Sequence, residues 1–166
     1  MPEIIVIAHN IRSTHNVGSI FRTCEGFGVK QLILSGYTPV PFVNKPDPVA
    51  GRLPHEAEKT TRQIHKTALG AETMVPFMHY KTLDLACPEL AGYLIVALEQ
   101  HPRSIPINSF TPPQRLALLL GEEVNGIPPE YLTKCHTILE IPMNGKKESF
   151  NVSVAAGIAL YALTMR

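Results

Sequence analysis

The sequence has no tryptophan, only three cysteines and almost no net charge. Cys24, Cys87 and Cys135 are odd in number and lack CxxC spacing, which argues against a disulfide framework and a cysteine-rich zinc site. Fifteen Lys and Arg residues against fourteen Asp and Glu residues give a formal net charge of +1. The chain is therefore no histone-like polycation, and any nucleic acid must bind to local patches.

Long hydrophobic runs are also missing. No apolar run approaches the roughly 18 residues that a membrane span requires. The N-terminal segment MPEIIVIAHN has an acidic residue and lacks the apolar region of a signal peptide. The seven histidines show no metal-ligand spacing, so we expect no metal site. Unpaired thiols fit a reducing compartment, and we expect a cytosolic protein.

What the sequence does contain is a globular composition, with 45% hydrophobic and 17% charged residues over a length that fits one domain. Short apolar runs alternate with amphipathic segments, and a proline-rich irregular loop covers 36–55. Strands are expected at 4–8, 31–34, 73–77, 93–98, 115–120 and 137–141, and helices at 16–27, 56–69, 80–90, 130–136 and 151–165. This alternation predicts an α/β fold with an open, mostly parallel sheet of about six strands and helices on both faces.

Three polar loops follow expected strands, at 9–16, 121–126 and 142–149. In a parallel sheet the carboxyl ends of the strands share one edge, and ligands bind at that edge. The sequence therefore predicts that these three loops meet and form a ligand site.

The first loop, NIRSTHNVGSIFR, leads into a helix. Asn16 can cap that helix, and Gly18 lets another backbone or a ligand approach closely. Arg22 lies two turns further on. Its guanidinium fits either a salt bridge on the helix surface or a forked contact with a phosphate.

The second and third loops carry weaker signals on their own. The second, LLLGEEVNGIP, resembles a ligand-cradling turn, but it is neither a P-loop nor a dinucleotide fingerprint. The third, IPMNGKKESFNVSVAAGIALY, places Ser149 and Asn151 around a helix start. Either residue can cap the helix, and Asn151 can also point into the site.

Basic residues gather on one expected helix. Lys59, Arg62 and Lys66 share a face of it, with Lys45 and Arg52 in the adjacent loop. Such a face is either simply solvated or a strip that binds phosphates.

Together the three loop segments resemble the three motifs of the SpoU–TrmH branch of the SPOUT RNA methyltransferases. The resemblance runs from Ile4 to Tyr161, with the motifs in order and each after an expected strand. It implies a C-terminal trefoil knot that holds S-adenosylmethionine, and a homodimer with active sites near the subunit interface. It further implies that residues 1–166 form a single catalytic domain without an extra RNA-binding domain.

The resemblance also implies site residues. The expected catalytic residues are Asn16, Arg22, Glu123, Ser149 and Asn151, the expected cofactor contacts are Leu98, Gly121, Ile141, Ser149 and Phe150, and the expected RNA contacts are Arg12, Arg22, Arg52, Lys59, Arg62 and Lys66. Within the doublet Glu122–Glu123, the spacing G-x-E-x-x-G favours Glu123. Glu123 would organise the knot loop or neutralise charge, and the Asn and Ser side chains would orient the ribose and Arg22.

The implied reaction is methyl transfer to a ribose 2′-hydroxyl. The family assigns proton handling to Arg22. An arginine, with a pKa above about 12, is a poor base. The alternative is that Arg22 grips an RNA phosphate while another group takes the proton.

The expected substrate is tRNA, with rRNA as the alternative. A rival hypothesis is a catalytically idle RNA-binding homodimer, against which the presence of Asn16, Arg22 and Asn151 argues. A nucleotide-binding hydrolase would need a P-loop or a nucleophile–base pair, and the sequence shows neither.

Overall fold

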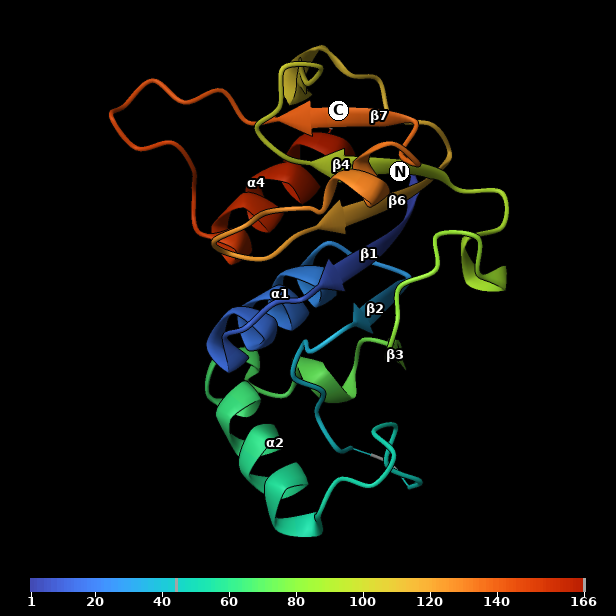
Figure 1. Cartoon of the computed structure of the whole chain (residues 1–166). Coiled ribbons are helices and arrows are strands. Elements are labelled where there is room, and N and C mark those ends of the chain that lie inside the picture. The colour runs from blue at the N-terminus through green and yellow to red at the C-terminus, as the bar shows by residue number, and fades with distance from the viewer. Residues whose placement is uncertain (44, 166) are drawn as a thin grey trace.

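The computed structural model describes residues 1–43 and 45–165, and one parallel sheet organises them (Figure 1). The strands follow the order β3-β2-β1-β6-β4-β7-β5, and every neighbouring pair is parallel. They are β1 (Glu3–His9), β2 (Gln31–Ser35), β3 (Phe77–Tyr80), β4 (Leu94–Leu98), β5 (Ile105–Pro106), β6 (Arg115–Leu120) and β7 (Thr137–Glu140). The open parallel sheet is confirmed. The sheet has seven strands rather than about six. The additional strand is the two-residue β5, which lies in a proline-rich connection and pairs with β7.

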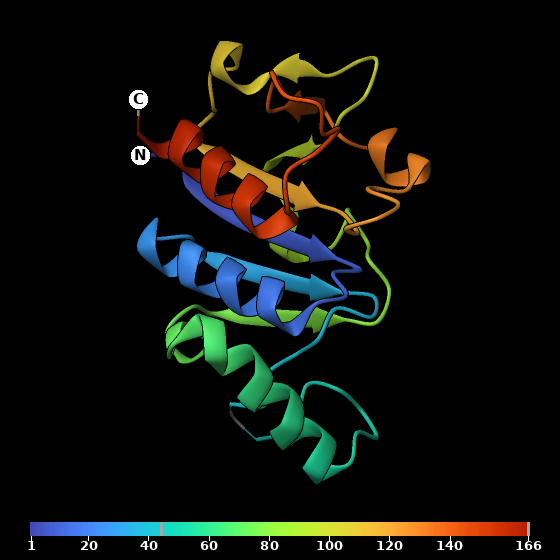
Figure 2. The same cartoon turned by 90° about the vertical axis from the view of Figure 1, so that its left-hand side faces the viewer.

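Three long helices cover one face of the sheet, as Figure 2 shows. They are α1 (Thr14–Gly26), α2 (Pro54–Ala68) and α4 (Val152–Thr164). The buried side chains of these helices pack against every second residue of the central strands, which is the pattern of a strand with two buried faces.

The other face is covered mostly by irregular chain. A segment that contains the short helix η2 (Pro88–Leu90) packs there together with α3 (Pro129–Leu132). Helices on both faces are thus confirmed, but the cover is uneven. The predicted helix at 80–90 is wrong, because Leu83 and Leu85 reach the core from irregular chain and only Pro88–Leu90 form a short 3₁₀ helix.

The segment around Pro76 also differs from the prediction. A 3₁₀ helix, η1 (Ala71–Thr73), occupies the start of the strand expected at 73–77, and β3 begins only at Phe77. Pro76 has no N–H to donate to a neighbouring strand, so the ladder with β2 begins directly after it. The remaining short helix is η3 (Ile107–Ser109).

Close packing of α1 on α2 explains Gly18. A Cβ atom at this position would lie 2.2 Å from the Thr67 hydroxyl oxygen and 2.3 Å from the Ile64 carbonyl oxygen. The expected close approach of another backbone is therefore confirmed, and that backbone belongs to α2. The expected helix cap at Asn16 is wrong, since α1 starts earlier and the Ser13 hydroxyl caps it by accepting the Asn16 backbone N–H.

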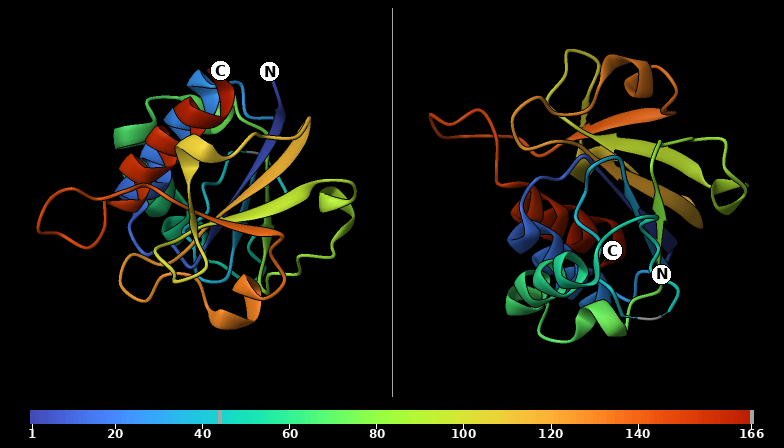
Figure 3. Two further views of the ribbon diagram at one scale, coloured as in Figure 1. Left: turned by 90° about the horizontal axis from the view of Figure 1, so that it is seen from above. Right: turned by 60° about the horizontal axis from the view of Figure 1, so that its bottom comes forward.

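The loop between β7 and α4 reaches away from the body of the molecule before the chain returns to the helix layer (Figure 3). Its residues from Asn144 to Asn151 are exposed. The trefoil knot implied for this part of the chain stays a prediction. Within residues 1–43 and 45–165, no helix is long and apolar enough to cross a membrane.

Candidate active site

The Glu123 carboxylate connects the loop after β6 to the loop after β1. Its Oε2 accepts the backbone N–H of Arg12 at 3.0 Å, and its Oε1 accepts the backbone N–H of Ser13 at 3.2 Å. The Asn16 side-chain amide also donates to Oε1, at 2.9 Å. Two of the three predicted loops therefore meet at one carboxylate.

Asn151 brings in the third loop. Its Nδ2 donates to Oδ1 of Asn16 at 3.1 Å. Its own Oδ1 caps α4 by accepting the backbone N–H of Ser153 at 2.9 Å and the Ser153 hydroxyl at 2.7 Å. A continuous chain of hydrogen bonds thus runs from the start of α4 through Asn151 and Asn16 to Glu123, and each amide has a fixed orientation.

Glu123 stays ionised although it is partly buried. Burial raises its pKa, but the hydrogen bonds from the Arg12 N–H, the Asn16 amide and the Ser13 N–H outweigh burial and lower the pKa below its usual value. The first turn of α1 has no acidic residue of its own. The carboxylate therefore supplies the negative charge that the start of a helix favours.

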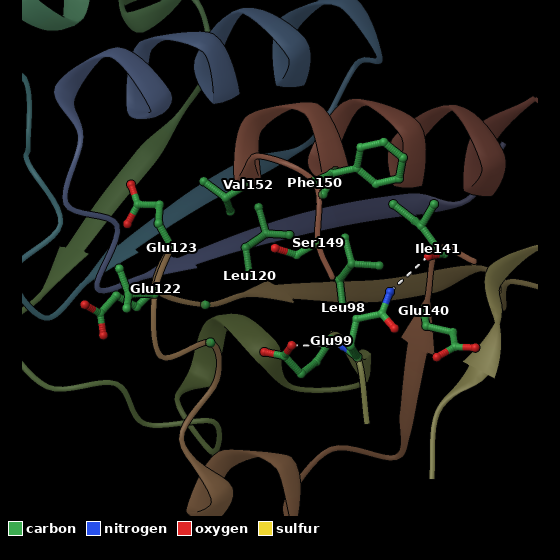
Figure 4. Close-up of a pocket in the computed structure, with 15 residues that line it drawn as sticks. Leu98, Glu99, Leu120, Glu122, Glu123, Glu140, Ile141, Ser149, Phe150 and Val152 are labelled. Atoms are coloured by element: carbon green, nitrogen blue, oxygen red, sulfur yellow. Dashed lines mark hydrogen bonds between the residues drawn. The ribbon is translucent and has the colours of Figure 1, made fainter. Parts of the chain in front are cut away.

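A hollow opens beside this hydrogen-bonded chain, at the carboxyl ends of β4, β6 and β7 (Figure 4). Its cavity volume is about 150 Å³. All five expected cofactor contacts line it, namely Leu98, Gly121, Ile141, Ser149 and Phe150. Figure 4 shows Glu123 at one end of the group and Glu140 at the other.

Glu99 holds one wall of the hollow in place. Its Oε2 accepts the Ile127 backbone N–H at 2.9 Å, and its Oε1 accepts the Gln100 backbone N–H at 2.9 Å. Gly126 passes over this carboxylate with a φ of +68°, and a Cβ there would lie 2.2 Å from Glu99 Oε2. At Gly121 a Cβ would lie 2.5 Å from the carbonyl carbon of Gly126. Both glycines are therefore required by close packing.

The lining suits a ligand that combines an apolar body with positive charge. Leu98, Leu120, Ile141, Phe150 and Val152 supply apolar surface, whereas the carboxylates of Glu99, Glu122, Glu123 and Glu140 line the same space without any Lys or Arg side chain. S-adenosylmethionine carries a sulfonium and an ammonium group next to an aromatic base, so these residues fit it. Among the residues that the structure describes, no three His, Cys, Asp or Glu side chains are placed to hold a metal ion.

Arg22 lies apart from the hollow. It is exposed on the outer surface of α1, and its side chain makes no hydrogen bond or ion pair within residues 1–43 and 45–165. Arg12 is also exposed, with its guanidinium 4.0 Å from Glu122 at the rim of the site. The structure therefore brings together Asn16, Glu123, Ser149 and Asn151, but it does not bring Arg22 to them.

The other basic residues fall into two groups. Lys59, Arg62 and Lys66 are exposed along α2, and within the described chain no ion pair neutralises them. Arg52 differs, because its guanidinium binds both Asp47 oxygens and donates to the Val40 carbonyl oxygen at 2.6 Å. Its side chain is only 10% exposed. Arg52 thus stabilises the fold of the proline-rich loop and is not free to bind RNA as expected.

Sequence reasoning missed several residues of the hollow. Glu99, Gln100 and Glu140 line it, and Gln100 Nε2 also donates to the Ile141 carbonyl oxygen at 3.1 Å. All three lie at the carboxyl ends of expected strands. That position at the end of a strand is the signal in the sequence that marks them.

Comparison with known proteins now adds to this geometry. The model of the SpoU rRNA Methylase family matches residues 3–46 and 49–161. The chain is 30% identical over 159 residues to the tRNA (guanosine(18)-2′-O)-methyltransferase of Aquifex aeolicus, covering 96% of this chain and 67% of the relative. It is 29% identical over 163 residues to the 23S rRNA (guanosine-2′-O-)-methyltransferase RlmB of Nitrosomonas europaea, covering 96% and 55%.

Solved structures show the same fold. An AdoMet-bound rRNA methyltransferase from Sinorhizobium meliloti superposes with a TM-score of 0.77 at 26% identity, covering 96% of this chain and 55% of that one. The A. aeolicus TrmH/SpoU tRNA-modifying enzyme gives a TM-score of 0.75 at 25% identity, covering 98% and 74%. The chain spans about half the length of several of the curated relatives it matches.

Proposed function

Because the chain belongs to the SpoU rRNA Methylase family, we propose that it transfers a methyl group from S-adenosylmethionine to a ribose 2′-hydroxyl of a structured RNA. The observation that carries this proposal is the hydrogen-bonded chain from Asn151 through Asn16 to Glu123, at the side of a hollow that fits the cofactor. We further propose that residues 1–166 form one catalytic domain.

When bound, S-adenosylmethionine supplies an electrophilic methyl group. The protein must hold the ribose oxygen in line with it, and fixed orientation of this kind lowers a barrier substantially. Asn16 and Asn151 suit this task, because their amides are locked by hydrogen bonds and stay partly exposed. Ser149 lines the hollow with a hydroxyl that has no hydrogen bond within the described residues, so it can bind the ribose or the cofactor.

Glu123 acts in this proposal as a positioning residue. Its two oxygens already accept three hydrogen bonds, so it holds Asn16 and the two loops in place. Its negative charge also favours a cationic ligand in the adjacent hollow. The other member of the doublet, Glu122, accepts a hydrogen bond from the Asn125 side-chain amide at 2.7 Å.

We propose that the active form is a homodimer. The exposed side of α4 and the residue that follows it are apolar, with Val154 49%, Tyr161 63% and Met165 56% exposed. Arg22 lies on α1, which packs directly beside α4. A second copy seated on this surface would bury the apolar side chains and would bring the partner's Arg22 toward the active site, where it grips an RNA phosphate or assists proton removal.

The RNA substrate we propose is tRNA, with rRNA as the alternative. The free cations Lys59, Arg62 and Lys66 form a strip along α2 that suits a phosphate backbone. The relatives include enzymes named for each substrate. We place the protein in a reducing compartment such as the cytosol, since all three cysteines are free thiols.

One experiment tests the proposal. The protein is incubated with radiolabelled S-adenosylmethionine and either bulk tRNA or rRNA, and 2′-O-methylation is mapped. We expect label in tRNA, and label only in rRNA would select the alternative. Binding of RNA without cofactor binding by calorimetry would instead support an idle RNA-binding homodimer.

Arg22→Ala tests the role of the free guanidinium. We expect slower methyl transfer with an unchanged affinity for S-adenosylmethionine, because Arg22 does not line the hollow. A variant that methylates at the wild-type rate would remove Arg22 from the mechanism.

A further inference from the structure

A second hollow opens at the same edge of the sheet, beyond the ends of β2 and β3. It measures about 610 Å³, compared with about 150 Å³ for the first hollow by the same measure. Its walls come from the start of α1, the loop after β2, the proline-rich loop, the middle of α2 and the end of β3. The proposed function assigns no role to it.

We propose that this second hollow receives an unstacked base of the RNA substrate, with the adjoining phosphate at Lys81. The inference rests on the proposed RNA methyltransferase function and deepens it. Sequence-specific RNA recognition typically splays single bases out and stacks them on flat side chains.

The position of the second hollow supports this assignment. Thr14 lines it, and the preceding residue, Ser13, donates its backbone N–H to Glu123. The chain at Ser13 and Thr14 therefore contacts both the Glu123 carboxylate and the second hollow. We expect a nucleotide whose ribose lies at Asn16 to place its own base, or that of its neighbour, in the second hollow.

Tyr37 gives the second hollow a flat aromatic surface on a backbone that a hydrogen bond holds in place. Its side chain is 54% exposed, and its backbone N–H donates to the Asn10 side-chain oxygen at 3.2 Å. Asn10 itself adopts a left-handed conformation with φ 56°. Pro39 and Pro48 add further flat apolar surface. Base–aromatic stacking of this kind is sequence-tolerant and contributes strongly to affinity.

The polar groups of the second hollow suit a nucleotide rather than an apolar ligand. The Lys81 ammonium and the Thr60 hydroxyl have no hydrogen bond or ion pair within residues 1–43 and 45–165. His79 uses only Nδ1, which lies 3.4 Å from the Pro48 carbonyl oxygen. Arg52 is engaged by Asp47 and Val40 and shapes the wall. The free donors are therefore those of Lys81, His79 and Thr60.

The two hollows differ in charge. Four carboxylates and no Lys or Arg side chain line the first. No carboxylate lines the second, where the Arg52 guanidinium is paired with Asp47 and Lys81 is a cation without an ion pair within residues 1–43 and 45–165. A cationic cofactor and an anionic nucleotide would thus be sorted to their own sides of the Asn16–Glu123 contact.

A tryptophan probe tests the inference directly, because the chain has no tryptophan of its own. Tyr37→Trp places a single fluorophore in the second hollow. We expect guanosine 5′-monophosphate to quench it saturably, and inorganic phosphate alone to leave it unchanged. The other three nucleoside monophosphates measure base preference, and a quench by any of them supports the proposal. Absence of saturable quenching by all four would overturn it.

Two further substitutions in the Tyr37→Trp background locate the ligand. Thr60→Phe fills the second hollow without removing a hydrogen bond, and we expect it to weaken nucleotide binding at least tenfold. Lys81→Ala should weaken binding about threefold or more, while Lys134→Ala, an exposed lysine outside the hollow, should change it less than twofold. Equal binding in the Tyr37→Trp parent and in its Thr60→Phe and Lys81→Ala derivatives would overturn the assignment.

The outcome is separable from that of the proposed function. Cofactor binding and methyl transfer by the wild type, without any quench in Tyr37→Trp, would refute this site alone. Saturable quenching in a protein that binds no S-adenosylmethionine would support nucleotide binding in the second hollow and refute the proposed reaction.

Discussion

Two glutamates form polar clusters at opposite edges of the sheet, and their partners differ in charge. At the amino edge, Glu3 accepts a hydrogen bond from the Tyr93 hydroxyl and forms ion pairs with Lys30 Nζ at 2.9 Å and Arg115 Nε at 3.2 Å. At the carboxyl edge, the donors to Glu123 within residues 1–43 and 45–165 are all neutral, namely two backbone N–H groups and the Asn16 amide.

This difference separates a structural cluster from a functional one. Cations neutralise Glu3, and the bonds from Tyr93 and Lys30 lower its pKa to about 2. Neutral donors orient Glu123 without cancelling its charge, so the negative field extends into the adjacent hollow. A charge that is held but not paired is what a site for a cationic cofactor requires.

The largest effect is expected from Asn16→Ala, which breaks the chain of hydrogen bonds between Glu123 and Asn151. We expect the single-turnover rate of methyl transfer to fall about 100-fold, because misplacing a reacting group by about 1 Å costs on that order. Affinity for S-adenosylmethionine should change less than twofold. Asn125→Ala, which removes an amide bonded only to Glu122, serves as the matched control and should leave the rate unchanged.

Asn151 combines a structural and a functional role, and two substitutions separate them. Asn151→Ala removes the cap of α4, which costs about 1 kcal/mol and lowers Tm by about 2–4 °C. It should also slow methyl transfer about tenfold. Asn151→Asp retains a capping oxygen but donates nothing to Asn16, so it should restore Tm and leave transfer slow. Recovery of the rate along with Tm would show that only the cap matters.

Gly126→Ala tests the wall of the first hollow. The added Cβ would meet the Glu99 carboxylate at 2.2 Å, and the positive φ adds strain. We expect the affinity for S-adenosylmethionine, measured by calorimetry, to fall about fivefold. Gly145→Ala is the control, since no atom lies within 4 Å of its added Cβ. Equal affinities in the two variants would mean that the wall does not contact the cofactor.

The smallest effect is expected at the amino edge. Lys30→Met removes one cation from Glu3, and Tm at pH 7 should fall by no more than about 3 °C without any change in methyl transfer. Because the pKa of Glu3 is lowered, its stabilising contribution is present above about 4.5 and is lost as the pH falls toward about 2. The Tm difference between variant and wild type should therefore shrink over that range, which a pH series of thermal melts would reveal.

The sequence predicted the centre of the sheet well and its margins less well. The runs 4–8 and 116–120 are buried on both faces, and such runs are typical of a central parallel strand. At the margins, the two-residue β5 has too little sequence to carry a pattern. A helix was expected at 80–90, although Leu83 and Leu85 reach the core from irregular chain and only Pro88–Leu90 are helical.

The part of the site that depends only on the topology of the sheet could be predicted from the sequence. Three loops after parallel strands must share an edge, so the meeting of Asn16, Glu123 and Asn151 could be anticipated. The choice of Glu123 over Glu122 rested only on spacing, and hydrogen bonds across more than 100 residues show which side chain faces Asn16. The engagement of Arg52 with Asp47 and the distance of Arg22 from the hollow depend on loop and helix orientation, which no spacing rule gives.

We infer that the Glu123 carboxylate, which neutral donors hold, organises the reaction, whereas the Glu3 carboxylate, which cations neutralise, stabilises the fold. Glu123→Gln and Glu3→Gln make the same chemical change at the two edges, and single-turnover methyl transfer with Tm measures both consequences. We predict that Glu123→Gln slows transfer about 100-fold, whereas Glu3→Gln leaves the rate within twofold and lowers Tm by a few degrees. A Glu123→Gln variant that transfers methyl within twofold of the wild-type rate would contradict the account.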